Sequence, residues 1–175
     1  MKDIIRVRIV RKKLLRGMSI IPAFVIMIGI FIFSSQTAVE SSGLSSGITE
    51  QLFDLMVHLF SIELQVSDRV IWLDLVETII RKAAHMTEYA MLAIAVSFSL
   101  YVYGKRFVNL ILWSEIICVL YAITDEIHQL FIPGRSGQTM DVLIDGCGAM
   151  IGCLIFAFFC RILANRVQKV VNQEK

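Results

Sequence analysis

An uninterrupted apolar segment near the N-terminus is the feature that most restricts how this chain can fold. Residues 17–39 contain no Lys, Arg, Asp, Glu or His, and about 20 such residues are enough to cross a bilayer as a helix. Three further segments are long and apolar, although they also carry ionisable residues. The sequence therefore predicts an all-α, integral membrane four-helix bundle. Its transmembrane helices are expected near 18–36, 84–104, 110–131 and 139–161.

The composition of the whole chain agrees with this fold class. Apolar residues make up 57% of the 175 residues and charged residues only 18%, whereas a soluble domain is about 25% charged. This balance excludes a disordered chain. Four cysteines are too few for a disulfide scaffold. A net charge of +2 argues against nucleic acid as a partner.

Lys and Arg are distributed unevenly along the chain, and this predicts its orientation. In the predicted topology, 13 of the 17 Lys and Arg residues lie on one side: in an arm (1–17), in the hinge after the second helix, at Arg161, and in a tail (162–175). Because segments rich in Lys and Arg stay in the cytoplasm, both termini are expected to be cytoplasmic. The protein is then a multi-pass protein of the cell membrane, with loops 37–80 and 132–138 outside.

The longer outer loop is expected to hold short amphipathic helices. It begins with a stretch rich in Ser and Gly (41–47) that predicts a flexible turn. Apolar residues then recur at helical spacing within 48–59 and again within 70–80. Helices of this kind lie in the membrane interface. They could act as a structural lid over the bundle or as a gate for a substrate, and the sequence leaves both open.

Polar residues gather at the outer end of all four predicted transmembrane helices. Ionisable residues inside membrane spans are costly and are usually functional. Several of these are three or four positions apart, which places them on one helix face. The sequence therefore predicts an outward-facing polar pocket. Its candidate ligand-binding residues are Gln36, Arg81, Lys82, His85, Glu88, Asp125, Glu126, His128, Gln129, Arg135, Asp141 and Asp145.

The same residues resemble the signature of the VanZ-like family of membrane proteins. The segment 81–89 (RKAAHMTEY) is similar to the family's second-helix motif. Segment 125–135 (DEIHQLFIPGR), with Asp141 and Asp145-Gly146 after it, resembles the third-to-fourth helix signature. Segment 33–36 (FSSQ) is similar to the end of the first helix. The resemblance covers about residues 20–160, and 18–161 is the expected domain.

The resemblance implies a small multi-pass protein of the cell envelope. The family's namesake is associated with low-level resistance to the glycopeptide antibiotic teicoplanin. Many relatives occur without a resistance cluster, so the resemblance alone does not assign antibiotic resistance to this chain.

Several uses of the polar cluster stay open. It could be a structural network that fixes helix register. It could bind a membrane lipid or a lipid-linked envelope intermediate, with Arg81, Lys82 and Arg135 holding phosphate or carboxylate and the glutamines holding sugar or peptide. It could also belong to a noncatalytic subunit of an envelope complex.

A membrane hydrolase acting on a lipid headgroup is a further alternative. The catalytic candidates are His85 and His128 as general bases, oriented by Glu88 and Asp125. Metal-dependent chemistry is conceivable, but no strong metal signature such as His-Glu-x-x-His is present, so no metal ligand is assigned. Whether the protein is an enzyme, its cofactor and its oligomeric state stay unassigned. The segment Gly148-x-x-x-Gly152 favours close helix packing within the bundle over dimerisation.

Overall fold

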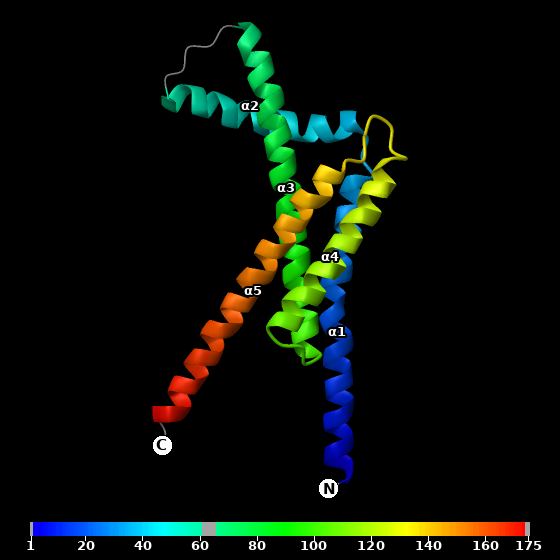
Figure 1. The fold of residues 1–175 in the computed structure, drawn as a ribbon, viewed down its shortest axis with the longest axis vertical. Helices are drawn as coiled ribbons and strands as arrows, with labels where there is room; N and C mark the ends of the chain where they lie inside the picture. The colour runs from blue at the N-terminus through cyan, green and yellow to red at the C-terminus, as the bar shows by residue number, and fades with distance from the viewer. Residues whose placement is uncertain (1, 61–65, 174–175) are drawn as a thin grey trace.

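The computed structural model describes residues 2–60 and 66–173, and the described residues form five α-helices and no strand. The predicted all-α fold class is confirmed. In chain order the helices are α1 (Lys2–Ser34), α2 (Ala38–Phe60), α3 (Val66–Val102), α4 (Val108–Gln129) and α5 (Thr139–Gln173). Figure 1 shows α3 through the middle of the molecule, α2 lying across one end, and both termini at the other end. Residue 1 of the predicted arm, 61–65 of the predicted outer loop and 174–175 of the predicted tail lie outside the described residues.

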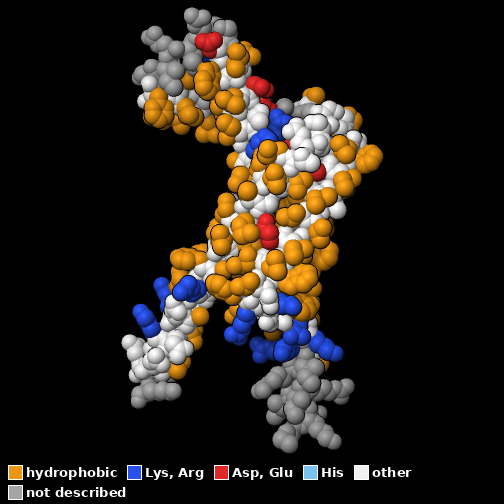
Figure 2. Space-filling view, viewed as in Figure 1, with side chains coloured by type: hydrophobic (Ala, Val, Ile, Leu, Met, Phe, Trp, Pro, Cys, Tyr) orange, Lys and Arg blue, Asp and Glu red, His pale blue; other side chains and the backbone are white. Residues whose placement is uncertain are grey.

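Three of the described helices are long and apolar enough to cross a membrane. These segments are Val10–Ser34, Asp68–Val102 and Thr139–Gln173. Figure 2 shows hydrophobic side chains over the middle of the visible face. Lys and Arg gather toward the N-terminal end of α1 and the C-terminal end of α5. Helix α4 is not among the three, so the prediction of four spans is not confirmed. It carries Glu115 in its middle and Asp125 and Glu126 near its end.

The helices extend beyond the predicted boundaries. Helix α1 includes the predicted basic arm from Lys2, and α5 continues through the predicted tail to Gln173. The segment 70–80 is not a separate amphipathic helix but the first part of α3. The stretch 41–47, predicted to be a turn, is helical within α2. A glycine in a helix costs only about 1 kcal/mol, so the two glycines there do not end a helix of 23 residues.

Two glycines allow α5 to cross α3 at close range. A Cβ added to Gly148 would overlap the backbone of Met86, and one added to Gly152 would overlap the backbone of Ala90. Small residues at such a crossing let helix backbones approach closely in a membrane. The Gly-x-x-x-Gly segment therefore packs inside this chain, as predicted. It brings the start of α5, with its two aspartates, beside the polar face of α3.

Hydrogen bonds from polar side chains hold α1 and α4 in place. The Ser99 hydroxyl on α3 donates to the Ser19 carbonyl on α1 at 2.5 Å. The Tyr121 hydroxyl on α4 donates to the Met27 carbonyl on α1 at 2.6 Å. These bonds fix the position of α1 along its own axis relative to α3 and α4. The C-terminal end of α1 consequently lies beside the C-terminal end of α4.

Candidate functional site

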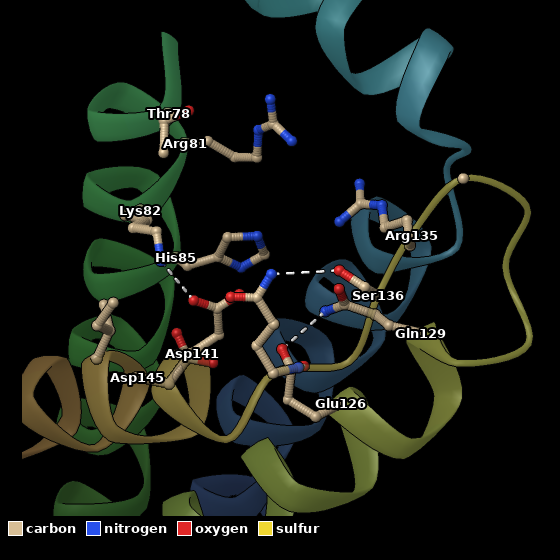
Figure 3. Close-up of a pocket in the computed structure, with 13 residues that line it drawn as sticks. Thr78, Arg81, Lys82, His85, Glu126, Gln129, Arg135, Ser136, Asp141 and Asp145 are labelled. Atoms are coloured by element: carbon tan, nitrogen blue, oxygen red, sulfur yellow. Dashed lines mark hydrogen bonds and ion pairs between the residues drawn. The ribbon is translucent and has the colours of Figure 1, made fainter. Parts of the chain in front are cut away.

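A polar pocket of about 420 Å³ lies between α3, the end of α4, the following loop and the start of α5. Figure 3 shows side chains from these four segments pointing into one opening. Eight of the twelve residues proposed from the sequence line it, and they come from elements far apart along the chain. They are Arg81, Lys82, His85, Glu126, Gln129, Arg135, Asp141 and Asp145.

Local helical spacing explains how each segment presents its residues. On α3, positions 78, 81, 82 and 85 share one face because they are three, four and seven residues apart. Asp141 and Asp145 on α5 are four apart, and Glu126 and Gln129 on α4 are three apart. Gly134 adopts a φ of +77°, which lets the chain reverse after α4 and return Arg135 to the opening.

Lys82 and Asp141 form an ion pair that links α3 to α5. The Lys82 ammonium donates to Asp141 Oδ1 at 2.7 Å, and both side chains are about one-third exposed. Each group therefore largely neutralises the other. The Lys82 ammonium is less available for a bound anion than the sequence implied.

Arg135 is held by the end of α1 through backbone carbonyls. Its Nε donates to the Gln36 carbonyl at 2.9 Å and its Nη2 to the Phe33 carbonyl at 3.5 Å. Carbonyls at a helix C-terminus lack partners within the helix and carry partial negative charge. Burial, and after it the positive charge of Arg81, lowers the pKa of Arg135, while Asp125 and Glu126 partly oppose this. The guanidinium still stays charged at neutral pH.

Glu126 has a structural task in the loop between α4 and α5. Its carboxylate accepts the backbone N–H of Gln138 at 2.8 Å and the Gln129 side-chain amide at 3.3 Å. Gln138 immediately precedes α5, so the carboxylate binds an N–H at a helix start, where negative charge is favoured. The side-chain amide of Gln138 in turn donates a hydrogen bond to the Ser136 hydroxyl at 3.2 Å.

Asp145 and His85 carry polar atoms that the protein leaves unused. Asp145 is 2% exposed and lines the pocket, and its Oδ1 accepts no hydrogen bond from the described residues. His85 Nδ1 is similarly buried without a hydrogen bond from the described chain, and it lies 3.6 Å from Glu88 Oε2. Buried polar atoms without a partner are costly. A ligand or water in the pocket would supply partners.

Four of the residues proposed from the sequence do not line this pocket. Asp125 is buried toward α1 and accepts hydrogen bonds from Ser34 at 2.8 Å and Gln129 at 3.2 Å. His128 stacks on Phe31 of α1, with ring centroids 4.4 Å apart, and shares a hydrogen bond with Ser35 at 3.1 Å. These two side chains lie on the α1 side of α4. They connect α1 to α4.

The other two residues that do not line the pocket are Glu88 and Gln36. Glu88 lies one turn after His85 on α3, with its Oε2 3.6 Å from His85 Nδ1. Gln36 contributes its backbone carbonyl to Arg135, and its side chain borders a separate shallow cavity between the end of α1 and α2.

Five residues that line the pocket were not predicted: Thr78, Gly134, Ser136, Gln138 and Ile144. Thr78 lies one turn before Arg81, so extending the polar face of α3 would have found it. Ser136 and Gln138 belong to the loop, whose path sequence spacing does not reveal. Within the described residues, no group of three His, Cys, Asp or Glu side chains is arranged to hold a metal ion.

A comparison with protein families gives one match. A family model described as VanZ/LLP1 matches residues 19–161, a range that contains every residue of the pocket. No curated protein and no solved structure matches the chain.

Proposed function

The chain belongs to the VanZ/LLP1 family, and from that premise and the charges of the pocket we propose that it binds the anionic headgroup of a lipid-anchored component of the cell envelope. The ligand is a membrane lipid or a lipid-linked envelope intermediate. Its phosphate lies between the guanidinium groups of Arg81 and Arg135.

The arrangement of these two arginines carries the proposal. Arg81 from α3 and Arg135 from the loop extend toward the same opening from opposite sides (Figure 3). Arg81 Nη2 lies 3.4 Å from Glu77 Oε1, and Arg135 is bonded to carbonyl groups. Their like charges repel each other, which contributes to the lowered pKa of Arg135. A phosphate placed between them would remove this repulsion and accept charge-assisted hydrogen bonds from both.

The position of the pocket in the bundle supports an outward-facing site. The loop that bears Arg135 lies at the end of the molecule opposite to both termini (Figure 1). Lys and Arg gather at the other end, toward the N-terminus of α1 and the C-terminus of α5 (Figure 2). Because basic ends stay in the cytoplasm, we place the pocket at the outer surface, at the depth of lipid headgroups. Both termini are then cytoplasmic.

Native mass spectrometry of the purified full-length protein tests headgroup binding. The probes are a polyprenyl phosphate and phosphatidylglycerol, which separate a lipid-linked carrier from a bulk lipid. Arg135→Gln removes one charge-assisted contact, worth about 1.5–3 kcal/mol, so affinity for the preferred probe should fall about tenfold or more. Arg69→Gln is the matched control, because Arg69 is half exposed and pairs with Asp54 away from the pocket. Equal binding by both variants would refute the proposal.

One observation favours hydrolysis of the bound headgroup as a second candidate. His85 is the one predicted general base that lines the pocket, and Glu88 Oε2 lies 3.6 Å from its Nδ1. If the protein is a hydrolase, His85→Ala should abolish phosphate release from the preferred probe while leaving its retention intact. Absence of phosphate release from the wild-type protein would leave binding as the function. Catalysis by His128 is less favoured, because that ring stacks on Phe31.

Glycopeptide resistance is the cellular consequence that the family likeness raises. A protein that holds a lipid-anchored envelope component at the outer surface changes what a glycopeptide can reach there. Cells that produce the protein should then lose teicoplanin sensitivity, and those producing Arg135→Gln at the same level should not. A noncatalytic subunit of an envelope complex would instead be insensitive to this change.

A further inference from the structure

Another cavity lies at the opposite end of the bundle from the polar pocket. It has a volume of about 510 Å³ and is formed by the end of α3, the start of α4 and the second half of α5. Its lining, all within the described chain, includes two arginines, Arg106 and Arg161, and no Asp or Glu. Every other lining residue is apolar or aromatic, including Tyr101, Phe107 and Phe156. We call this cavity the basic groove.

The groove follows from the way α5 leaves the bundle. At Gly148 and Gly152 the backbones of α5 and α3 are in close contact. One turn later the large ring of Phe156 meets Tyr101 of α3 edge to face, with centroids 6.2 Å apart. Bulky side chains that follow small ones force the helices apart, and Figure 1 shows α5 diverging from α3 toward its C-terminus. The opening between them is therefore encoded by the sequence of α5.

The turn between α3 and α4 supplies the third wall in a strained conformation. Phe107 has a φ of +42° and a ψ of −109°, and it is 60% exposed. An aromatic residue rarely adopts positive φ, and such strain costs about 1–3 kcal/mol. Backbone strain of this kind is concentrated at ligand-binding sites. Here it places Arg106 and Phe107 on the wall of the groove.

The chemistry of the groove selects its occupant. An apolar crevice on a membrane helix is filled by acyl chains, because water is absent from the hydrocarbon region. Two guanidinium groups with no carboxylate in the lining complement a phosphate. The groove also lies at the basic end of the molecule, and the cytoplasmic leaflet is rich in anionic lipids. We propose that the basic groove binds an anionic phospholipid, with its phosphate between Arg106 and Arg161 and an acyl chain along Phe156.

This site is independent of the polar pocket and is tested separately. The full-length protein is exchanged into nanodiscs of phosphatidylglycerol or of phosphatidylcholine with identical acyl chains, and retained lipid is counted by native mass spectrometry. The wild-type protein should retain phosphatidylglycerol preferentially. In the double variant Arg106→Gln/Arg161→Gln the preference should fall at least fivefold. Arg69→Gln, at a residue that lines neither cavity and pairs with Asp54, should leave this charge-dependent preference in place.

The matched control changes two basic residues of α5, the helix that carries Arg161, that do not line the groove. Arg166→Gln/Lys169→Gln removes the same total charge from the protein, two positive charges, but should keep the preference. Equal loss in both double variants would show a nonspecific effect of basic charge and overturn the site. Retention of full preference in Arg106→Gln/Arg161→Gln would overturn it as well. The two single variants give the same readout if the double variant is unstable.

Cys160 gives a second measurement without any change to the arginines. Its thiol lines the groove and is partly exposed. In a Cys147→Ser background, a membrane-permeable maleimide should modify Cys160 several-fold more slowly in phosphatidylglycerol than in phosphatidylcholine, because the bound lipid covers the thiol. Equal rates in the two lipids would contradict occupancy by an anionic lipid.

Discussion

The buried carboxyl group of Asp145 should lower the stability of the ligand-free protein but favour binding of a ligand in the pocket. Its side chain is 2% exposed, and Oδ1 has no hydrogen-bond donor among the described residues. A buried acceptor left in this state costs about 1–3 kcal/mol. Because Asp145 lines the pocket, a group bound there could supply the missing hydrogen bond. A donor on the bound headgroup, such as a hydroxyl or an ammonium, would do so.

The substitution Asp145→Leu tests this conflict. It removes the unpartnered oxygen and places a side chain of similar size in a buried position. We expect the ligand-free protein to gain about 1–3 kcal/mol of stability, measured by thermal unfolding in detergent. The same variant should retain less of the lipid probe in native mass spectrometry. A loss of both stability and binding would show that Asp145 is needed for folding alone. The control is Ile144→Leu, a neighbouring change that alters shape but no polar group.

At the residue scale, the sequence predicted which side chains share a helix face but not which neighbour that face meets. His85 and Arg81 were placed in a pocket from their spacing, and they line it. Asp125 and Gln129 also share a face, yet Asp125 is bonded to Ser34 of α1. Spacing within one helix fixes an angle around that helix. The rotation of α4 against α1 depends on contacts such as that of Tyr121 with Met27, which sequence spacing does not report.

At the scale of elements, a substitution at Gly152 tests how closely α5 crosses α3. A methyl group there would overlap the Ala90 carbonyl. Gly152→Ala should therefore destabilise the bundle, despite the higher helix propensity of alanine, by about 1–3 kcal/mol. Gly146→Ala is the matched control on the same helix, because its added Cβ would meet Val119 at an ordinary 3.5 Å. It should be neutral or slightly stabilising. Equal thermal stability of the two variants would contradict the tight crossing.

The elements themselves were predicted unevenly, for identifiable reasons. Long apolar stretches indicated the cores of α1, α3 and α5, since length and hydropathy suffice for a membrane span. The outer parts were less predictable. Segment 70–80 was expected to stand apart, but no residue there breaks a helix, and α3 runs on from Val66. The basic arm likewise continues α1 as far as Lys2, because Lys and Arg are good helix formers.

The whole molecule has two chemically different ends. The polar pocket and the loop carrying Arg135 lie at one end, and the basic groove and both termini lie at the other (Figure 1). Arg16 of α1 lies over Tyr103, 5.3 Å from its ring centroid, so the basic part of α1 and the turn before α4 are at the same level. Segments rich in Lys and Arg stay in the cytoplasm. This asymmetry predicts how the molecule sits in the bilayer.

Cysteine labelling in intact cells tests that orientation. In a Cys147→Ser/Cys160→Ser background, which removes the two cysteines that are not buried, a cysteine introduced as Ser136→Cys should react with a membrane-impermeant maleimide added outside. One introduced as Lys105→Cys should react only after the membrane is permeabilised, because the turn before α4 lies at the basic end. The two positions flank α4, so opposite accessibility would also show that α4 connects the two surfaces of the membrane. Labelling of both from the same side would contradict that arrangement. Labelling of Lys105→Cys alone from outside would place the polar pocket in the cytoplasm, and the proposed contact with an envelope component at the outer surface would then be impossible.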